Sequence, residues 1–163
     1  MQRGWQRWSS STSESDLIVM GVDPGKIGGI AIINTSKPEK PRLIRMPLLE
    51  DRTYDIEAMQ DILVSFCPDV LVIERVTRPA QLVRCMALFE GLGAAVSGSV
   101  VTVPPAVWKR RLGLIHQNKH ASMELARNLY PHTAHELKRV TVDDGLAEAL
   151  LIAHDYLEQY EST

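Results

Sequence analysis

Two short apolar segments near the start of the chain limit the possible folds more than any other feature of the sequence. They cover residues 17–22 and 28–33, and the sequence DPGKIGG, residues 23–29, joins them. Segments of about six residues suit buried strands better than helices. Proline and glycine favour a tight turn between antiparallel strands. The sequence therefore predicts a β-hairpin with Asp23 at the carboxyl end of its first strand.

The rest of the chain alternates between strand-like and helical patterns. Residues 42–46 are expected to form a third strand, and two more strands begin at residues 69 and 99. Apolar residues at helical spacing predict helices over 56–66, 80–96, from Pro105, 122–129 and 143–160. A hairpin followed by β-α-β units predicts an α/β domain, with a mixed five-stranded sheet and helices on both faces.

The length of 163 residues fits one domain, which we expect to cover residues 17–163. Residues 1–16 are polar and rich in serine, and this composition predicts a disordered tail or the end of an organelle transit peptide. No apolar segment is long enough to predict a membrane-spanning helix. Two cysteines are too few for a disulfide framework, so a reducing intracellular compartment is expected.

Positive charge is concentrated in one part of the chain, although the net charge is −2. Residues 104–140 contain seven Lys or Arg residues against two Glu. Such asymmetry indicates either a basic face suited to a polyanion or an ordinary solvated helix surface.

Two acids are expected to meet at one edge of the sheet. Asp23 ends the first strand, and Glu74 ends the segment VLVIE. Ligands in open α/β sheets gather beyond the carboxyl ends of the strands. If these two strands are parallel neighbours, their carboxylates lie close together and repel unless a cation lies between them.

The last predicted helix adds two more acids. Asp144 and Glu148 are four residues apart and share one helical face, whereas Asp143 points elsewhere or caps the helix. The residues around them are mainly leucine and alanine, so unpaired carboxylates would be costly there.

Divalent cations would offset the charge of these four acids. Mg²⁺, or Mn²⁺ in its place, prefers oxygen ligands and is commonly held by a few carboxylates together with phosphate oxygens and water. Two such ions can activate a water molecule and stabilise a leaving oxygen in phosphodiester cleavage. Asp23, Glu74, Asp144 and Glu148 are therefore the candidate metal ligands.

Five segments, in order, resemble the motifs of the RuvC family of Holliday junction resolvases. They are GVDPGKIGGIAII, DVLVIERV, TVPPAVWKRRLGL, NKHASMELA and DDGLAEALLIA. The third and fifth are most similar to the chloroplast resolvases of plants and algae, the monokaryotic chloroplast group. The resemblance extends from about residue 17 to residue 156.

This resemblance implies an RNase H-like fold and a homodimer that nicks opposing strands of a four-way DNA junction with Mg²⁺ or Mn²⁺. Asp23 and Glu74 match the first two catalytic acids, and Asp144 and Glu148 match the closing pair. The bacterial enzymes have Asp-x-x-Asp at this closing pair. The different spacing here leaves Asp143 and Asp144 as alternatives, and we favour Asp144 because it shares a face with Glu148.

The resemblance also implies roles for basic and polar residues. Lys119 is a candidate catalytic residue that neutralises charge at the scissile phosphate. The segment after Glu74 matches a loop that the family inserts into the junction, where Arg and Gln can bind base edges. The candidate DNA-binding residues are Lys109, Arg110, Arg111, Lys119, Arg75, Arg78 and Gln81.

Two other functions remain open from the sequence. DPGKIGG also resembles the phosphate loop of actin-like nucleotide-binding proteins, which usually need two such domains. A junction-binding protein without cleavage is the second alternative, although four acids would weaken its binding to DNA. The resemblance to chloroplast enzymes implies a location in the plastid stroma or nucleoid.

Overall fold

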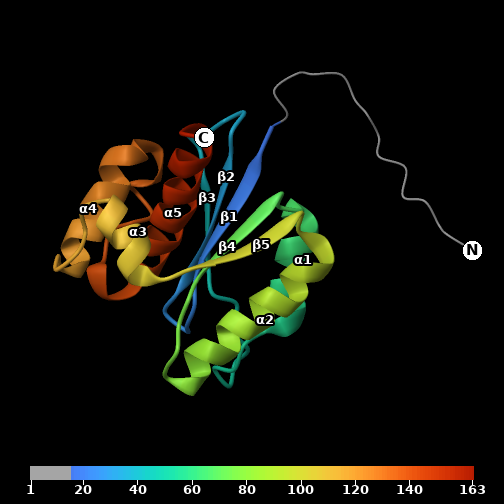
Figure 1. Ribbon diagram of the computed structural model, residues 1–163. Helices are drawn as coiled ribbons and strands as arrows, with labels where there is room; N and C mark the ends of the chain where they lie inside the picture. The colour runs from blue at the N-terminus through green and yellow to red at the C-terminus, as the bar shows by residue number, and fades with distance from the viewer. Residues whose placement is uncertain (1–15) are drawn as a thin grey trace, which may run out of the picture.

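The computed structural model describes residues 16–163, which are built around a five-stranded mixed sheet (Figure 1). The central strand β1 (Ile18–Asp23) is antiparallel to β2 (Gly29–Asn34) and parallel to β4 (Val70–Glu74). Strand β3 (Arg42–Arg45) lies outside β2, and β5 (Ser99–Val103) lies outside β4. The order β3-β2-β1-β4-β5 confirms the predicted mixed sheet.

Helices cover both faces of this sheet, as predicted (Figure 1). One face packs against α1 (Ile56–Phe66) and α2 (Ala80–Val96). The other carries α3 (Pro105–Arg111), α4 (Lys119–Leu129) and α5 (Val140–Glu161), and a short 3₁₀ turn, η1 (Pro131–Thr133), follows α4. The sheet therefore separates two hydrophobic cores.

The alternation of side chains along β1 and β4 determines which face receives the acids. In β1, Met20 and Val22 belong to the core beneath α1 and α2, whereas Val19 belongs to the core beneath α5. Successive side chains of a strand point to opposite faces. Asp23 therefore continues the row that faces α5.

Helix α5 lies directly on β1 because Gly21 has no side chain. A Cβ atom at Gly21 would be 2.2 Å from the carbonyl oxygen of Ala149. A larger residue at position 21 would therefore push α5 away from the sheet.

Two helices begin three residues earlier than predicted, at Lys119 instead of 122 and at Val140 instead of 143. The Asn118 side chain accepts a hydrogen bond from the backbone N–H of Ala121 and caps α4. The Asp143 carboxylate accepts hydrogen bonds from the backbone N–H groups before Val140, which stabilises the first turn of α5. The apolar pattern alone does not reveal these polar caps.

The predicted tail, apart from Asp16, lies outside the described residues. Within residues 16–163, none of the helices combines the length and the apolar character needed to cross a lipid bilayer.

Candidate active site

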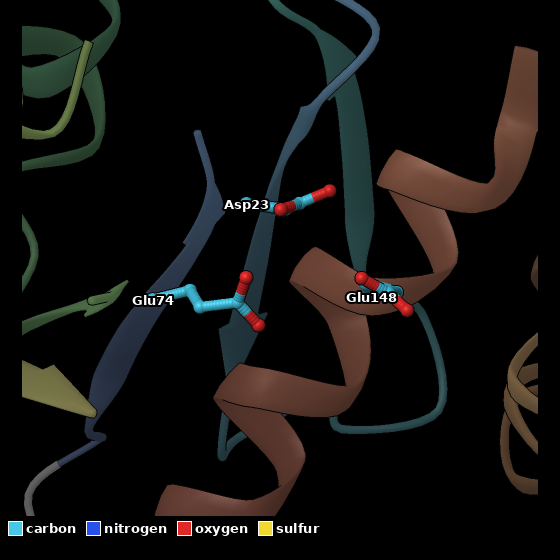
Figure 2. A group of neighbouring side chains, drawn as sticks. All are labelled: Asp23, Glu74 and Glu148. Atoms are coloured by element: carbon cyan, nitrogen blue, oxygen red, sulfur yellow. The ribbon is translucent and has the colours of Figure 1, made fainter. Parts of the chain in front are cut away.

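Three carboxylates from distant parts of the chain meet beside the carboxyl ends of β1 and β4. Asp23, Glu74 and Glu148 each present an oxygen, and these oxygens all lie within 4.8 Å of one another. Figure 2 shows Asp23 and Glu74 on the strands, with Glu148 facing them from α5. Glu74 is buried and the other two are partly buried.

The sheet register brings the first two acids together. Val22 of β1 pairs with Ile73 of β4, so Asp23 and Glu74 follow as parallel neighbours. Both side chains project toward α5, whose third turn supplies Glu148. The predicted meeting of these three acids agrees with the described geometry.

Burial and mutual repulsion disfavour the ionised form of this cluster. Burial, followed by Glu74, Glu148 and Asp144, raises the pKa of Asp23 well above its usual value, and Lys109 opposes this shift. Burial also raises the pKa of Glu74. A bound cation would reverse these effects by favouring the charged carboxylates.

The donor chemistry of the cluster fits a hard divalent cation. All three residues offer carboxylate oxygens, which Mg²⁺ and Mn²⁺ bind readily. Asp23, Glu74 and Glu148 are therefore the residues that could hold such an ion.

Asp143 and Asp144 have different environments. The Asp143 carboxylate accepts from Arg45 at 2.6 Å and from the backbone N–H groups of Lys138 and Arg139. Burial raises its pKa, but the hydrogen bonds from Arg139, Arg45 and Lys138 outweigh burial, and the pKa of Asp143 is lowered. The Asp143 carboxylate thus stabilises the start of α5 through these hydrogen bonds.

Asp144 faces the pocket that contains the acids and binds Lys119 there. Its Oδ2 lies 2.6 Å from Lys119 Nζ, and this contact raises the pKa of Lys119. Asp144 lies outside the group of three converging oxygens but lines the same cavity as Asp23 and Glu148.

Two predicted basic residues also line this cavity, which has a volume of about 560 Å³. Lys109 Nζ lies 3.1 Å from Glu148 Oε1, and Lys119 is the partner of Asp144. Ammonium groups beside the acids could hold a phosphate and limit the repulsion between the carboxylates and the phosphate.

The other candidate DNA-binding residues occupy several positions. Gln81 lines the cavity, and Arg78 and Arg110 are exposed. Arg75 donates to the Thr102 hydroxyl on β5. Arg111 pairs with buried Asp155 at 3.0 Å and so links α3 to α5, which differs from the expected phosphate contact.

Sequence reasoning missed the link between Trp108 and Glu74. Trp108 is fully buried, and its indole N–H donates to Glu74 Oε2 at 2.8 Å. This bond lowers the pKa of Glu74 against the larger effect of burial. A tryptophan beside Lys109 was the available signal, but the sequence does not indicate its hydrogen-bond partner.

Replacing Trp108 by Phe should weaken binding of Mn²⁺ and shift the acidic limb of any metal-dependent activity to higher pH. Phe keeps an aromatic ring but leaves a buried Glu74 oxygen without its donor, which typically costs about 1–3 kcal/mol. The Glu74 carboxyl would then hold its proton more strongly and compete with the metal. Titration of the protein with Mn²⁺ at several pH values measures the effect.

Tyr130→Phe provides a matched control because the Tyr130 hydroxyl bonds His154 at 2.8 Å, in the same core. It should leave the affinity for Mn²⁺ and its pH dependence unchanged. Equal behaviour of both variants would contradict a specific role for the Trp108–Glu74 bond.

Comparison with solved structures places this geometry on a known fold. The chain is similar to Thermus thermophilus RuvC in complex with a Holliday junction substrate, with a TM-score of 0.60 and 18% identity over 90% of this chain and 96% of that chain. It is also similar to the fowlpox virus Holliday junction resolvase, with a TM-score of 0.57 and 16% identity over 88% and 99% of the two chains. The fold is RNase H-like. No protein-family model matches the chain, and no curated protein matches its sequence.

Proposed function

We propose that the protein is a structure-selective endonuclease that resolves four-way DNA junctions by paired nicks in opposing strands. The convergence of Asp23, Glu74 and Glu148 within 4.8 Å carries this proposal. One structural neighbour with the same fold is a Holliday junction resolvase by name, and another is RuvC in complex with a Holliday junction substrate, which supports this choice among nucleases.

Each part of the cavity has a chemical task in this proposal. Asp23, Glu74 and Glu148 would hold Mg²⁺ or Mn²⁺, with Asp144 as a fourth candidate ligand if two ions bind. The bound metal would supply Lewis acidity for hydrolysis of a phosphodiester. Lys109 bridges toward Glu148 and restrains its position. Lys119 is mostly exposed and can exchange Asp144 for a phosphate oxygen.

Paired nicks require two active sites, and the described residues of one chain contain one such carboxylate cluster. We therefore include a homodimer in the proposal. Helix α2 exposes small residues, including Ala87, Gly91 and Ala94, which would permit close approach of a second copy. The large hydrophobic side chains that are exposed in the described region lie on other segments. The exposed face of α2 is therefore not a large apolar patch, which would have been the most direct support for a dimer.

The motif resemblance to chloroplast resolvases supports a plastid nucleoid as the place of action. A fluorescent fusion of the full chain tests this part of the proposal, and exclusion from plastids would contradict it.

A labelled four-way junction incubated with the protein and Mg²⁺ or Mn²⁺ tests the proposed activity. We expect symmetric nicks that disappear when a chelator is added. Equal cutting of a linear duplex of the same sequence would indicate a general nuclease. Junction binding without nicks would support the non-cleaving alternative.

Replacing Lys119 by Ala should slow nicking about tenfold, equivalent to ~1.4 kcal/mol in the activation free energy. The variant loses a cation that can bind the negatively charged phosphate. The effect is modest because the side chain is 67% exposed and therefore well solvated. Single-turnover rates on the junction measure it. Lys40→Ala, at the opposite edge of the sheet, should keep the wild-type rate, and an equal rate for Lys119→Ala would contradict this role.

A further inference from the structure

Two smaller hollows adjoin the cavity with the acids, one next to the other. The first hollow, of about 250 Å³, shares Lys26, Ile27, Gly28 and Arg52 with the cavity. The second, of about 390 Å³, shares Arg45 with the first. Because each hollow shares lining residues with its neighbour, the two hollows lie side by side next to the cavity, and we call these two hollows together the basic groove.

The basic groove carries an excess of positive charge. Its lining acids, among the residues that the structure describes, are Asp143 and Glu136. Asp143 is buried and already holds Arg45. The basic side chains that line the two hollows are Lys26, Arg45, Arg52, Lys138 and Arg139. This excess contrasts with the net charge of −2 of the whole chain and favours an anionic partner.

These cations come from four separate places in the chain, and Arg45 lies on β3. Lys26 lies in the turn between β1 and β2, and Arg52 lies between β3 and α1. Lys138 and Arg139 precede α5, and both are exposed. No contiguous run of basic residues marks the groove, so its charge depends on the tertiary fold.

Arg52 has a backbone conformation that places it at the junction of cavity and groove. Its φ angle is 68°, in the left-handed region that residues with a side chain seldom adopt. Its N–H donates to the carbonyl of Leu49, and the Leu49 N–H donates to Thr53, which forms a hydrogen-bonded turn. The Tyr54 hydroxyl donates to the carbonyl of Gln81 and fixes this turn beside α2.

The acid that precedes Arg52 in the chain is already hydrogen-bonded within its own turn. Asp51 accepts hydrogen bonds from the hydroxyl and backbone N–H of Thr53. These bonds, together with the nearby Lys26, lower the pKa of Asp51. Asp51 lines neither the cavity nor the groove. The Arg52 side chain, in contrast, lines both the cavity and the first hollow.

We infer that the basic groove binds the phosphate backbone of one duplex arm of the DNA, beyond the phosphate that is cleaved. This inference rests on the proposed function, because it takes the three-acid cavity as the cleavage site. The groove leads away from that cavity and offers several cations to one strand. Phosphate contacts of this kind fix the register of DNA without reading its sequence.

A groove variant with Arg52→Gly, Lys138→Ala and Arg139→Ala tests the inference. Glycine readily adopts the left-handed conformation at position 52, so the change removes charge while keeping the turn. Lys37→Ala with Lys40→Ala is the control, because these exposed lysines lie between β2 and β3 at the opposite edge. Both sets are made with Asp23→Asn to prevent cleavage, and their melting temperatures confirm folding.

The groove variant should bind a four-way junction at least about tenfold more weakly than the control in 0.1 M salt. Each phosphate contact contributes ~0.9 to the slope of log affinity against log salt, so the slope should become shallower by roughly 2 to 3. Shortening the junction arms should reduce the difference between the two variants. Equal affinities and salt slopes for the groove and control variants would overturn the inference.

Nicking by the same variants without Asp23→Asn separates this inference from the proposed function. If the wild type nicks the junction and the groove and control variants bind it equally well, only the inference about the groove would be overturned. If the wild type nicks no junction but the groove variant binds DNA more weakly than the control variant, only the proposed activity would be overturned. Failure of the wild type to bind DNA would overturn both.

Discussion

Replacing Asp23 by Asn is expected to reduce junction nicking by about 10³-fold or more, because it removes one carboxylate from the metal-binding cluster. Asparagine has nearly the same shape but carries no charge and binds hard cations less strongly. Asp23 also lies at the centre of the mutual repulsion, since Glu74, Glu148 and Asp144 all act on it. Quench-flow or gel measurements with saturating junction and Mn²⁺ give the rate.

The same substitution should stabilise the metal-free protein. Burial and the neighbouring acids raise the pKa of Asp23 in the folded state. Below a pH of about 4 the carboxyl is neutral in both folded and unfolded chains and contributes no difference. As the pH rises toward the folded-state pKa, the unfolded chain releases its proton first, so the wild type loses stability.

The difference in melting temperature between Asp23→Asn and the wild type, measured in chelator, should therefore increase with pH above about 4. Saturating Mn²⁺ should reverse the order, because metal binding stabilises the folded wild type. Asp61→Asn is the control, since Asp61 is an exposed acid on α1. A wild type that is more stable than Asp23→Asn in chelator at neutral pH would contradict the electrostatic account.

Replacing Gly145 by Ala should cost about 3 kcal/mol in the free energy of unfolding and displace α5. A Cβ atom there would be 2.2 Å from the carbonyl oxygen of Ile27 and 2.6 Å from the Cα of Gly28. Both atoms belong to the backbone, so the helix or the turn must move. The helix carries Asp144 and Glu148, and a shift of about 1 Å can cost 10²-fold in rate.

Chemical denaturation measures the loss of stability, and junction nicking measures the displacement. Gly91→Ala is the matched helical control for the stability measurement alone, because a Cβ atom at Gly91 meets no atom of the same chain within 4 Å, while nicking by this variant also depends on the proposed dimer face. In an exposed helix this change should stabilise the chain by roughly 0.5–1 kcal/mol. Similar stability changes at the two positions would show that the close approach of Gly145 to the turn is unimportant.

The sequence predicted the sheet and the meeting of Asp23 with Glu74 because both depend on local patterns. Apolar segments of strand length, each ending in an acid, bring those acids together if the strands are parallel neighbours, and β1 and β4 are parallel neighbours. The helical spacing of Asp144 and Glu148 likewise placed both acids toward the cavity.

The sequence did not predict side-chain contacts whose partners lie far along the chain. The acceptor of the Trp108 indole is a residue of β4, which only the packing of α3 against the sheet brings into reach. Asp144 binds Lys119 of α4 instead of joining the three-acid group. Arg52 carried no signal at all, since its place at the cavity depends on a left-handed turn. The early starts of α4 and α5 depend on capping side chains that the apolar pattern does not show.

Crystals of the protein soaked with Mn²⁺ give the most direct test of the central claim, through the anomalous scattering of the ion. We expect a peak coordinated by Asp23, Glu74 and Glu148 together, at about 2.0–2.2 Å from a carboxylate oxygen of each residue. The peak should be absent from Asp23→Asn crystals treated in the same way. Manganese bound elsewhere, with these three carboxylates uncoordinated at saturating Mn²⁺, would contradict the claim that they form a metal site.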